Sequence, residues 1–95
     1  MNSIVEAVCR HIKRKDQIAG IEMDFSRYRI FIYLRDGSVR KYSMLATCKA
    51  QFMQRWERAR QIFPHIDWYV PGDAIPDWVL PIPYQSQNAP ENSQN

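Results

Sequence analysis

Four side chains have the chemistry to ligate a transition metal, and they are Cys9, His11, Cys48 and His65. On a helix, Cys9 and His11 would point about 200° apart, so both could not easily bind one ion. The chain also lacks the CxxC and HxxxH spacings that are typical of zinc sites. We therefore predict no metal and no cofactor, and we interpret both cysteines as small core residues and both histidines as ordinary surface groups.

The sequence also lacks the residue patterns that are typical of thiol catalysis, of acid–base catalysis and of phosphate binding. Cys48 lies near the start of a predicted helix, where the helix dipole favours a thiolate, but no pattern marks either histidine as its base. Asp67, Asp73 and Asp77 fall in a proline-rich stretch, and we interpret them as turn and cap residues. With three glycines in the whole chain, no glycine-rich phosphate loop can be drawn. We therefore predict no catalytic residues and a protein that is not an enzyme.

Residues 21–44 predict three short antiparallel strands, around which the rest of the chain is organised. Ile21, Met23 and Phe25 alternate with acidic residues, and a second alternation runs over residues 28–34. Period two is typical of a half-buried strand, and the second run is rich in the β-branched and aromatic residues that strands favour.

A tight turn at Ser26 and Arg27 would fix the pairing of the first two strands. The pairs would be Phe25 with Tyr28, Met23 with Ile30 and Ile21 with Ile32 on one side, and Asp24 with Arg29 and Glu22 with Phe31 on the other. This register puts apolar residues opposite apolar residues and an acid opposite a base.

Asp36 and Gly37 are the strongest hairpin signal, because glycine accepts a positive φ without steric cost. The register of the third strand stays open. A three-residue loop at 35–37 would put Tyr42 and Met44 on the core side. A two-residue loop would put Val39 there instead and send the other two outward.

Amphipathic helices are predicted on both sides of the strands. The first runs from Ser3 to about Asp16, with Ser3 as the N-cap of a capping box. The second runs roughly from Thr47, which can cap it, to Phe63, where a proline stops it. The apolar stripes are Ile4, Val5, Val8 and Ile12 in the first helix and Ala50, Phe52, Met53, Trp56, Ala59, Ile62 and Phe63 in the second.

Composition changes abruptly after this helix, because all six prolines lie at or after position 64. Residues 66–70 indicate a short edge strand or extended segment, and residues 75–84 an extended arm packed on the domain. Residues 85–95 are polar, and we expect them to be disordered.

Together these elements predict an α+β fold in the order α-β-β-β-α. A three-stranded antiparallel meander would carry two helices on one face and a Pro/Trp-rich C-terminal arm. Residues 1–84 would form one globular domain that includes the arm at 64–84.

No apolar run is long enough to span a bilayer, and the first residues lack the apolar region of a signal peptide. We therefore expect a cytoplasmic protein without membrane contact, whose two cysteines are reduced.

Positive charge is unevenly distributed, since all 13 Lys and Arg residues fall between Arg10 and Arg60. The sheet side away from the core would present Arg29, Phe31, Tyr33 and Arg35, with Arg40 or Lys41 from the third strand. Arginines interleaved with aromatics suit phosphate neutralisation and base stacking. Acidic residues on the same side would neutralise Arg29, however, and the arm would cover Phe31 and Tyr33.

The element order resembles that of double-stranded RNA-binding domains, in topology alone. In that family the second helix begins with a Lys-rich motif, and the middle loop carries a Gly-Pro-x-His element. The corresponding segments here read ATCKAQ and RDGS. The resemblance therefore implies an arrangement of helices and strands and carries no RNA-binding activity over.

The arm offers residue types that are enriched at protein interfaces. The candidate interface residues are Trp68, Tyr69, Trp78 and Tyr84, with Arg55 and Arg58 on the second helix. Proline-bounded segments are stiff and lose little entropy on docking. We predict a small non-enzymatic binding protein, an accessory factor or inhibitor of a larger macromolecule, with a protein as the favoured partner. The alternative is an RNA- or DNA-binding protein that uses the sheet face, and an open edge strand could pair two copies into a homodimer.

Overall fold

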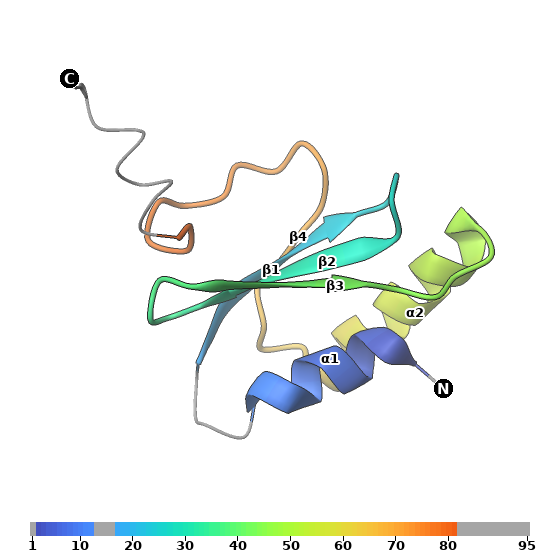
Figure 1. Ribbon diagram of the computed structural model, residues 1–95, viewed down its shortest axis with the longest axis horizontal. Coiled ribbons are helices and arrows are strands. Elements are labelled where there is room, and N and C mark those ends of the chain that lie inside the picture. Colours follow the sequence, from blue (N-terminus) through green and yellow to red (C-terminus); the bar gives the residue numbers. More distant parts are fainter. Residues whose placement is uncertain (1, 13–16, 82–95) are drawn as a thin grey trace.

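A computed structural model describes residues 2–12 and 17–81, and this part of the chain forms two helices and a four-stranded sheet (Figure 1). The elements are α1 (Ser3–Ile12), β1 (Ile18–Asp24), β2 (Arg29–Leu34), β3 (Val39–Ser43), α2 (Lys49–Ile62) and β4 (Trp68–Tyr69). The predicted α+β class and element order are confirmed. The predicted end of the first helix near Asp16 and the tail at 85–95 lie outside the described residues.

The sheet is mixed, with its strands in the order β3-β2-β1-β4. β1, β2 and β3 form the predicted antiparallel meander. β4 lies within the segment predicted as an edge strand and runs parallel to β1, pairing Trp68 with Ile21 and Tyr69 with Glu22. Parallel neighbours require a crossover connection, and α2 forms part of it.

The first hairpin has the predicted register, because Ile21 pairs with Ile32 and Asp24 pairs with Arg29. Its turn is wider than the predicted two-residue turn and covers residues 25–28. Tyr28 has a φ of 53°, in the left-handed region that bulky residues seldom adopt outside turns. The side chain of Asp24 accepts backbone hydrogen bonds within this turn, which a short polar residue can do.

The second hairpin uses the three-residue loop at 35–37. The amide of Gly37 donates to the carbonyl of Leu34 at 3.0 Å, and the amide of Leu34 donates to the carbonyl of Ser38 at 2.9 Å. Gly37 has a φ of 89°, which explains why glycine stands at this position.

This loop decides which side chains of β3 face the helices. Tyr42 and Met44 lie on the core side, as the three-residue alternative predicts. Arg40 lies on that side too, because it pairs with the fully buried Ile32. Val39 belongs to the opposite face, where it packs in a second apolar cluster.

Both helices cover the same face of the sheet (Figure 1). The main core between them and the sheet contains Ile4, Ala7, Val8, Ile21, Met23, Ile30, Ile32, Leu34, Met44, Phe52 and Ala59. Burial of a large aliphatic or aromatic side chain stabilises the fold by about 1.5–3 kcal/mol. Ala50, Met53 and Ile62 are exposed, contrary to the predicted stripe, because α2 buries only Phe52 and Ala59.

The starts of both helices differ from the prediction. Asn2 caps α1, since its Oδ1 accepts hydrogen bonds from the amides two and three positions later at 3.0 and 3.2 Å. Ser3 does not form a capping box, and its Oγ is buried without a hydrogen-bond partner among the described residues. Cys48 is the N-cap residue of α2, and the Thr47 hydroxyl donates to Oε1 of Gln51 instead.

Residues 70–81 cross the face of the sheet opposite the helices, where the arm was predicted to pack (Figure 1). The second cluster joins buried Ala19, Tyr33 and Val79 with the partly buried Phe31, Val39, Tyr69, Ile75 and Leu80. No helix in the described ranges combines the length and the apolar character that a membrane span requires.

The close approach of arm and sheet occurs at Gly20. A Cβ atom there would lie 2.7 Å from Cε2 of Tyr69 and 3.1 Å from Cγ1 of Val79. Because the predicted strands begin at Ile21, Gly20 was expected to precede the first strand. It instead lies inside β1, where the pairing with β2 shifts register between Ile18 and Gly20.

Candidate binding surfaces

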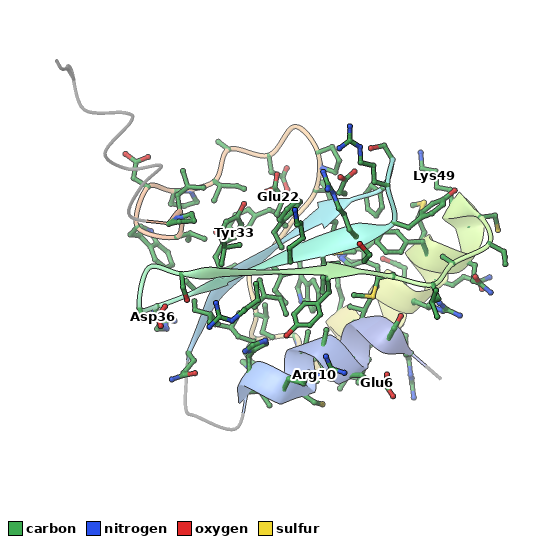
Figure 2. All side chains as sticks on the ribbon, viewed as in Figure 1. Glu6, Arg10, Glu22, Tyr33, Asp36 and Lys49 are labelled. Atoms are coloured by element: carbon green, nitrogen blue, oxygen red, sulfur yellow. The ribbon has the colours of Figure 1, made fainter. Side chains whose placement is uncertain are left out.

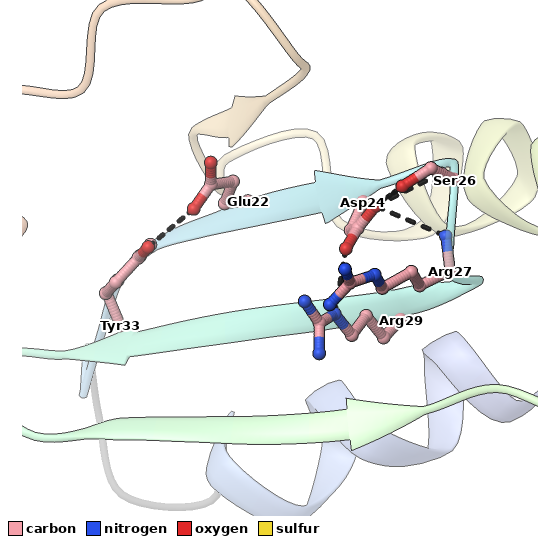
Figure 3. Close-up of polar contacts among 6 residues, drawn as sticks. All are labelled: Glu22, Asp24, Ser26, Arg27, Arg29 and Tyr33. Atoms are coloured by element: carbon pink, nitrogen blue, oxygen red, sulfur yellow. Dashed lines mark hydrogen bonds and ion pairs between the residues drawn. The ribbon is translucent and has the colours of Figure 1, made fainter.

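Tyr33, predicted to present its ring to a nucleic acid, is buried beneath the arm with 4% of its surface exposed. Its hydroxyl donates a 2.6 Å hydrogen bond to Oε1 of Glu22 (Figure 3). A base cannot stack on a ring whose faces are covered by the chain itself. Tyr33 is therefore part of the second apolar cluster, between the arm and the sheet.

Arg29 is held by its neighbours on the same sheet face. Its Nε lies 2.8 Å from Oδ2 of Asp24 (Figure 3). Its guanidinium carbon lies 5.1 Å from the centroid of the Phe31 ring. Oδ1 of Asp24 also accepts hydrogen bonds from the hydroxyl and amide of Ser26. The predicted neutralisation of Arg29 by an acid on this face is confirmed.

The remaining cations predicted for the sheet face are divided among three places. Lys41 is exposed opposite Phe31 and lines a shallow hollow with Glu22. Arg40 is also exposed, but it lies on the helix side of β3. Arg35 lies in the loop after β2 and lines a different hollow, beside Asp67. The predicted nucleic-acid face is therefore not assembled as one surface.

Two of the predicted interface aromatics attach the arm to the sheet. The indole Nε1 of Trp68 donates to the carbonyl of Phe63 at 3.2 Å, and its ring is half-buried against the main core. Tyr69 is half-buried over Gly20. Burial raises the pKa of Tyr69, and the nearby Asp67 and Asp73 raise it further.

The predicted interface arginines lie on α2, on the other side of the sheet from the arm (Figure 1). The guanidinium of Arg55 donates a hydrogen bond to the backbone carbonyl of Leu45. The backbone carbonyl of Arg55 accepts a hydrogen bond from Nδ2 of Asn2 at 2.9 Å. Arg58 is exposed. Tyr84, the last predicted interface residue, lies outside the described residues.

Among the described aromatic residues of the predicted interface, Trp78 is the one that the structure presents to solvent, with 59% of its surface exposed. The next residue, Val79, is 1% exposed and packs against the sheet. Hydrogen bonds from the amide of Val79 to the carbonyl of Pro76 and from the amide of Leu80 to the carbonyl of Asp77 close the turn around the indole. The burial of Val79 and these backbone hydrogen bonds therefore fix the backbone at the exposed Trp78.

A second group of side chains meets where α1 approaches β3, and we did not predict it. His11 is half-buried there with its Nε2 2.5 Å from the hydroxyl of Tyr42, which corrects its interpretation as an ordinary surface group. Arg10 lies over the same ring. The available signal was the three-residue loop, since only that register brings Tyr42 to the helix side.

Neither cysteine belongs to the core, contrary to the prediction. Cys9 and Cys48 are both exposed and unpaired, because each lies on the outer side of its helix or at its start. Within residues 2–12 and 17–81, no three side chains of His, Cys, Asp or Glu come together as a metal site would require.

Comparisons with protein-family models, with curated proteins and with solved structures give no match to this chain.

Proposed function

We propose that this protein is a small non-enzymatic binding protein, an accessory factor or inhibitor of a larger protein, and that Trp78 is its principal contact. One observation carries the proposal: Trp78 is 59% exposed although the residue after it is 1% exposed. An arm that served only to complete a small core would be expected to turn both of its tryptophans inward, as it does Trp68.

The backbone around Trp78 supports this role. Tryptophan is among the residue types that dominate binding energy at interfaces, where truncation often costs about 2 kcal/mol or more. Ordering a side chain or loop on binding reduces the net affinity. Here the turn is already closed by backbone hydrogen bonds, and Val79 anchors it against the sheet. The backbone that presents the indole is therefore already ordered in the folded protein.

Other candidate residues are assigned differently in this proposal. Trp68 and Tyr69 secure the arm, so their loss would affect the partner indirectly. Arg58 lies on α2, and it is left out of the proposed interface because α2 and the arm lie on opposite sides of the sheet (Figure 1). The alternative of nucleic-acid binding through the sheet face loses support because Tyr33 is buried.

We place this activity in the cytoplasm, and the exposure of both free thiols supports that placement. Exposed unpaired cysteines persist in a reducing compartment, whereas an oxidising one favours their pairing.

We further propose that the protein works as a monomer, although an edge-strand homodimer was a possibility. β3 is an outer strand of the sheet, and its consecutive residues Arg40 and Lys41 are both exposed, one on each face of the strand. Pairing two such edges would bring like charges together, and edge cations are a common means of preventing such pairing. We expect sedimentation velocity to show one species with the mass of a single chain. A stable dimer would contradict this.

The binding proposal is tested by affinity purification of the tagged protein from its own cells, with and without nuclease. We expect a discrete protein partner that survives nuclease and is lost with Trp78→Ala. Arg58→Ala is the matched control, because it truncates another exposed long side chain away from the arm. Retention of the partner by Trp78→Ala, or loss of all partners on nuclease treatment, would refute the proposal.

A further inference from the structure

Positive charge gathers where the end of α1 meets the outer strand β3. The guanidinium carbon of Arg10 lies 5.7 Å from the centroid of the Tyr42 ring. The ring of His11 lies 5.8 Å from the same centroid, in hydrogen-bond contact with the hydroxyl. Arg40 shares this face of β3 with Tyr42, because both pair with buried residues of β2. Lys41 adds a charge on the other face of the same strand.

The cations in this group are close enough to act on one another. The pKa of His11 lies below its ordinary value, first because partial burial disfavours the charged ring and then because Arg40 and Arg10 repel a further positive charge. Like charges held together in this way raise the energy of the free protein, and a bound anion would relieve the repulsion.

Acidic side chains lie at the ends of this group and do not close ion pairs with it. Glu6 lines the same groove as Arg10, and Asp36 lies in the loop before β3 (Figure 2). Hydrogen bonds from Ser38 lower the pKa of Asp36 first, and the charge of Arg40 lowers it further. The ion pairs of Arg29 with Asp24 and of Arg60 with Glu57 involve neither Arg10 nor Arg40, and neither Glu6 nor Asp36 forms an ion pair with a described cation. Arg10 and Arg40 therefore retain their capacity for an external anion.

We propose that this edge, formed by Arg10, His11, Arg40 and Lys41, binds the phosphate backbone of a nucleic acid. Guanidinium groups match phosphate geometry in a way that favours repeated charge-assisted contacts. An acidic protein surface would also be expected to bury apolar residues at its centre. The large exposed apolar side chains of the described chain are Leu45, Met53, Ile62 and Trp78, and none belongs to this edge. A polyanion that needs charge alone is therefore the better fit. This site is independent of Trp78.

The test measures fluorescence anisotropy of a labelled oligothymidylate at several salt concentrations. We expect the Arg10→Gln and Arg40→Gln double variant to bind about tenfold or more weakly. The slope of the logarithm of the binding constant against the logarithm of the salt concentration should be shallower for the variant, by about 0.7 for each phosphate that it no longer neutralises. Both side chains are exposed, so the variant should keep its fold, which circular dichroism checks. If the double variant does not fold, the same binding measurement is made with Arg40→Gln alone.

The control variant carries Lys49→Gln and Arg58→Gln, which remove the same charge from exposed positions on α2. We expect its affinity to stay near that of the wild type. Equal losses in the two variants would mean that net charge alone attracts the oligonucleotide, and they would overturn the proposal. No binding by the wild type, or tighter binding of a poly-glutamate peptide than of the oligonucleotide at equal salt, would overturn it too.

A titration of His11 by NMR gives a readout that net charge would not move. Bound phosphate should raise the pKa of His11, so that affinity increases as the pH falls toward that pKa. The groups facing His11 are Arg10 on α1 and Arg40 and Tyr42 on β3, with Glu6 and Asp36 at the ends of the edge. An unchanged His11 titration with oligonucleotide bound would place the phosphates elsewhere and reject this site.

Discussion

Asp24 is the residue that most clearly links the local sequence to the geometry of the first hairpin. It ends β1, pairs with Arg29 across the strands and accepts the hydrogen bonds of the following turn. Burial raises its pKa, but the hydrogen bonds from Ser26, Arg29 and the amide of Arg27 outweigh that effect and lower the pKa to about 2. One carboxylate therefore sets the turn and neutralises the neighbouring arginine.

We predict that Asp24→Asn lowers the free energy of unfolding by about 1–2 kcal/mol at neutral pH. Because the folded-state pKa is depressed, the stabilisation from Asp24 is complete above the unfolded value of 3.8 and is lost as the pH falls through about 2. Urea unfolding at pH 7 and near pH 2 measures this. Wild type and variant should converge at the acidic pH, and a constant difference at both pH values would contradict the assignment.

Single residues also show how far sequence reasoning reaches. The pair of Asp24 and Arg29 could be predicted, because both residues belong to one hairpin with a defined register. The bond from Tyr33 to Glu22 could not, although the two residues share the sheet face. Tyr33 also packs beneath an arm that arrives from far along the chain, and this packing makes the tyrosine a core residue.

At the scale of elements, the arm can pack closely on the sheet because Gly20 has no side chain. The ring of Tyr69 and the methyl of Val79 occupy the space that a Cβ would need. The packing of Val79 of the arm and Tyr33 of the sheet in one cluster depends on that approach. A glycine inside a strand weakens it intrinsically, so its presence here has a packing reason.

We predict that Gly20→Ala destabilises the protein by about 1–3 kcal/mol, because the new methyl overlaps the ring of Tyr69. Equilibrium denaturation measures the change. Adding Tyr69→Leu to Gly20→Ala should restore part of the loss relative to Tyr69→Leu alone, since the ring that clashes is gone. If Gly20→Ala costs nothing, the arm does not pack on β1 as described.

The elements themselves follow from local pattern more reliably than their surroundings do. Periodicity and turn residues predicted both helices and the meander, and β4 fell within a predicted edge segment. The parallel direction of β4 and the side of β3 that carries Arg40 were not determined by pattern alone. Loop length and long-range packing decide those features. The candidate sites depend on them, and they were therefore predicted less well than the fold.

At the scale of the whole molecule, the fold presents two surfaces of different chemistry. The arm side presents Trp78, which suits a protein partner. The α1–β3 edge presents cations, which suit a polyanion. Because different residues carry each surface, variants of one should leave the other intact.

We propose that Trp78 contacts a partner, whereas Trp68 stabilises the fold. Trp68→Ala should lower the free energy of unfolding by about 3 kcal/mol, the usual cost of truncating a large packed aromatic. Trp78→Ala should change it by less than about 0.5 kcal/mol, as exposed positions do.

The most direct test is calorimetric titration of the captured partner with wild-type protein and with Trp78→Ala, whose stability is measured on the same samples. We predict that Trp78→Ala lowers the affinity by about tenfold or more and leaves the free energy of unfolding unchanged. An affinity equal to that of the wild type, or a variant that unfolds as readily as Trp68→Ala, would contradict the account.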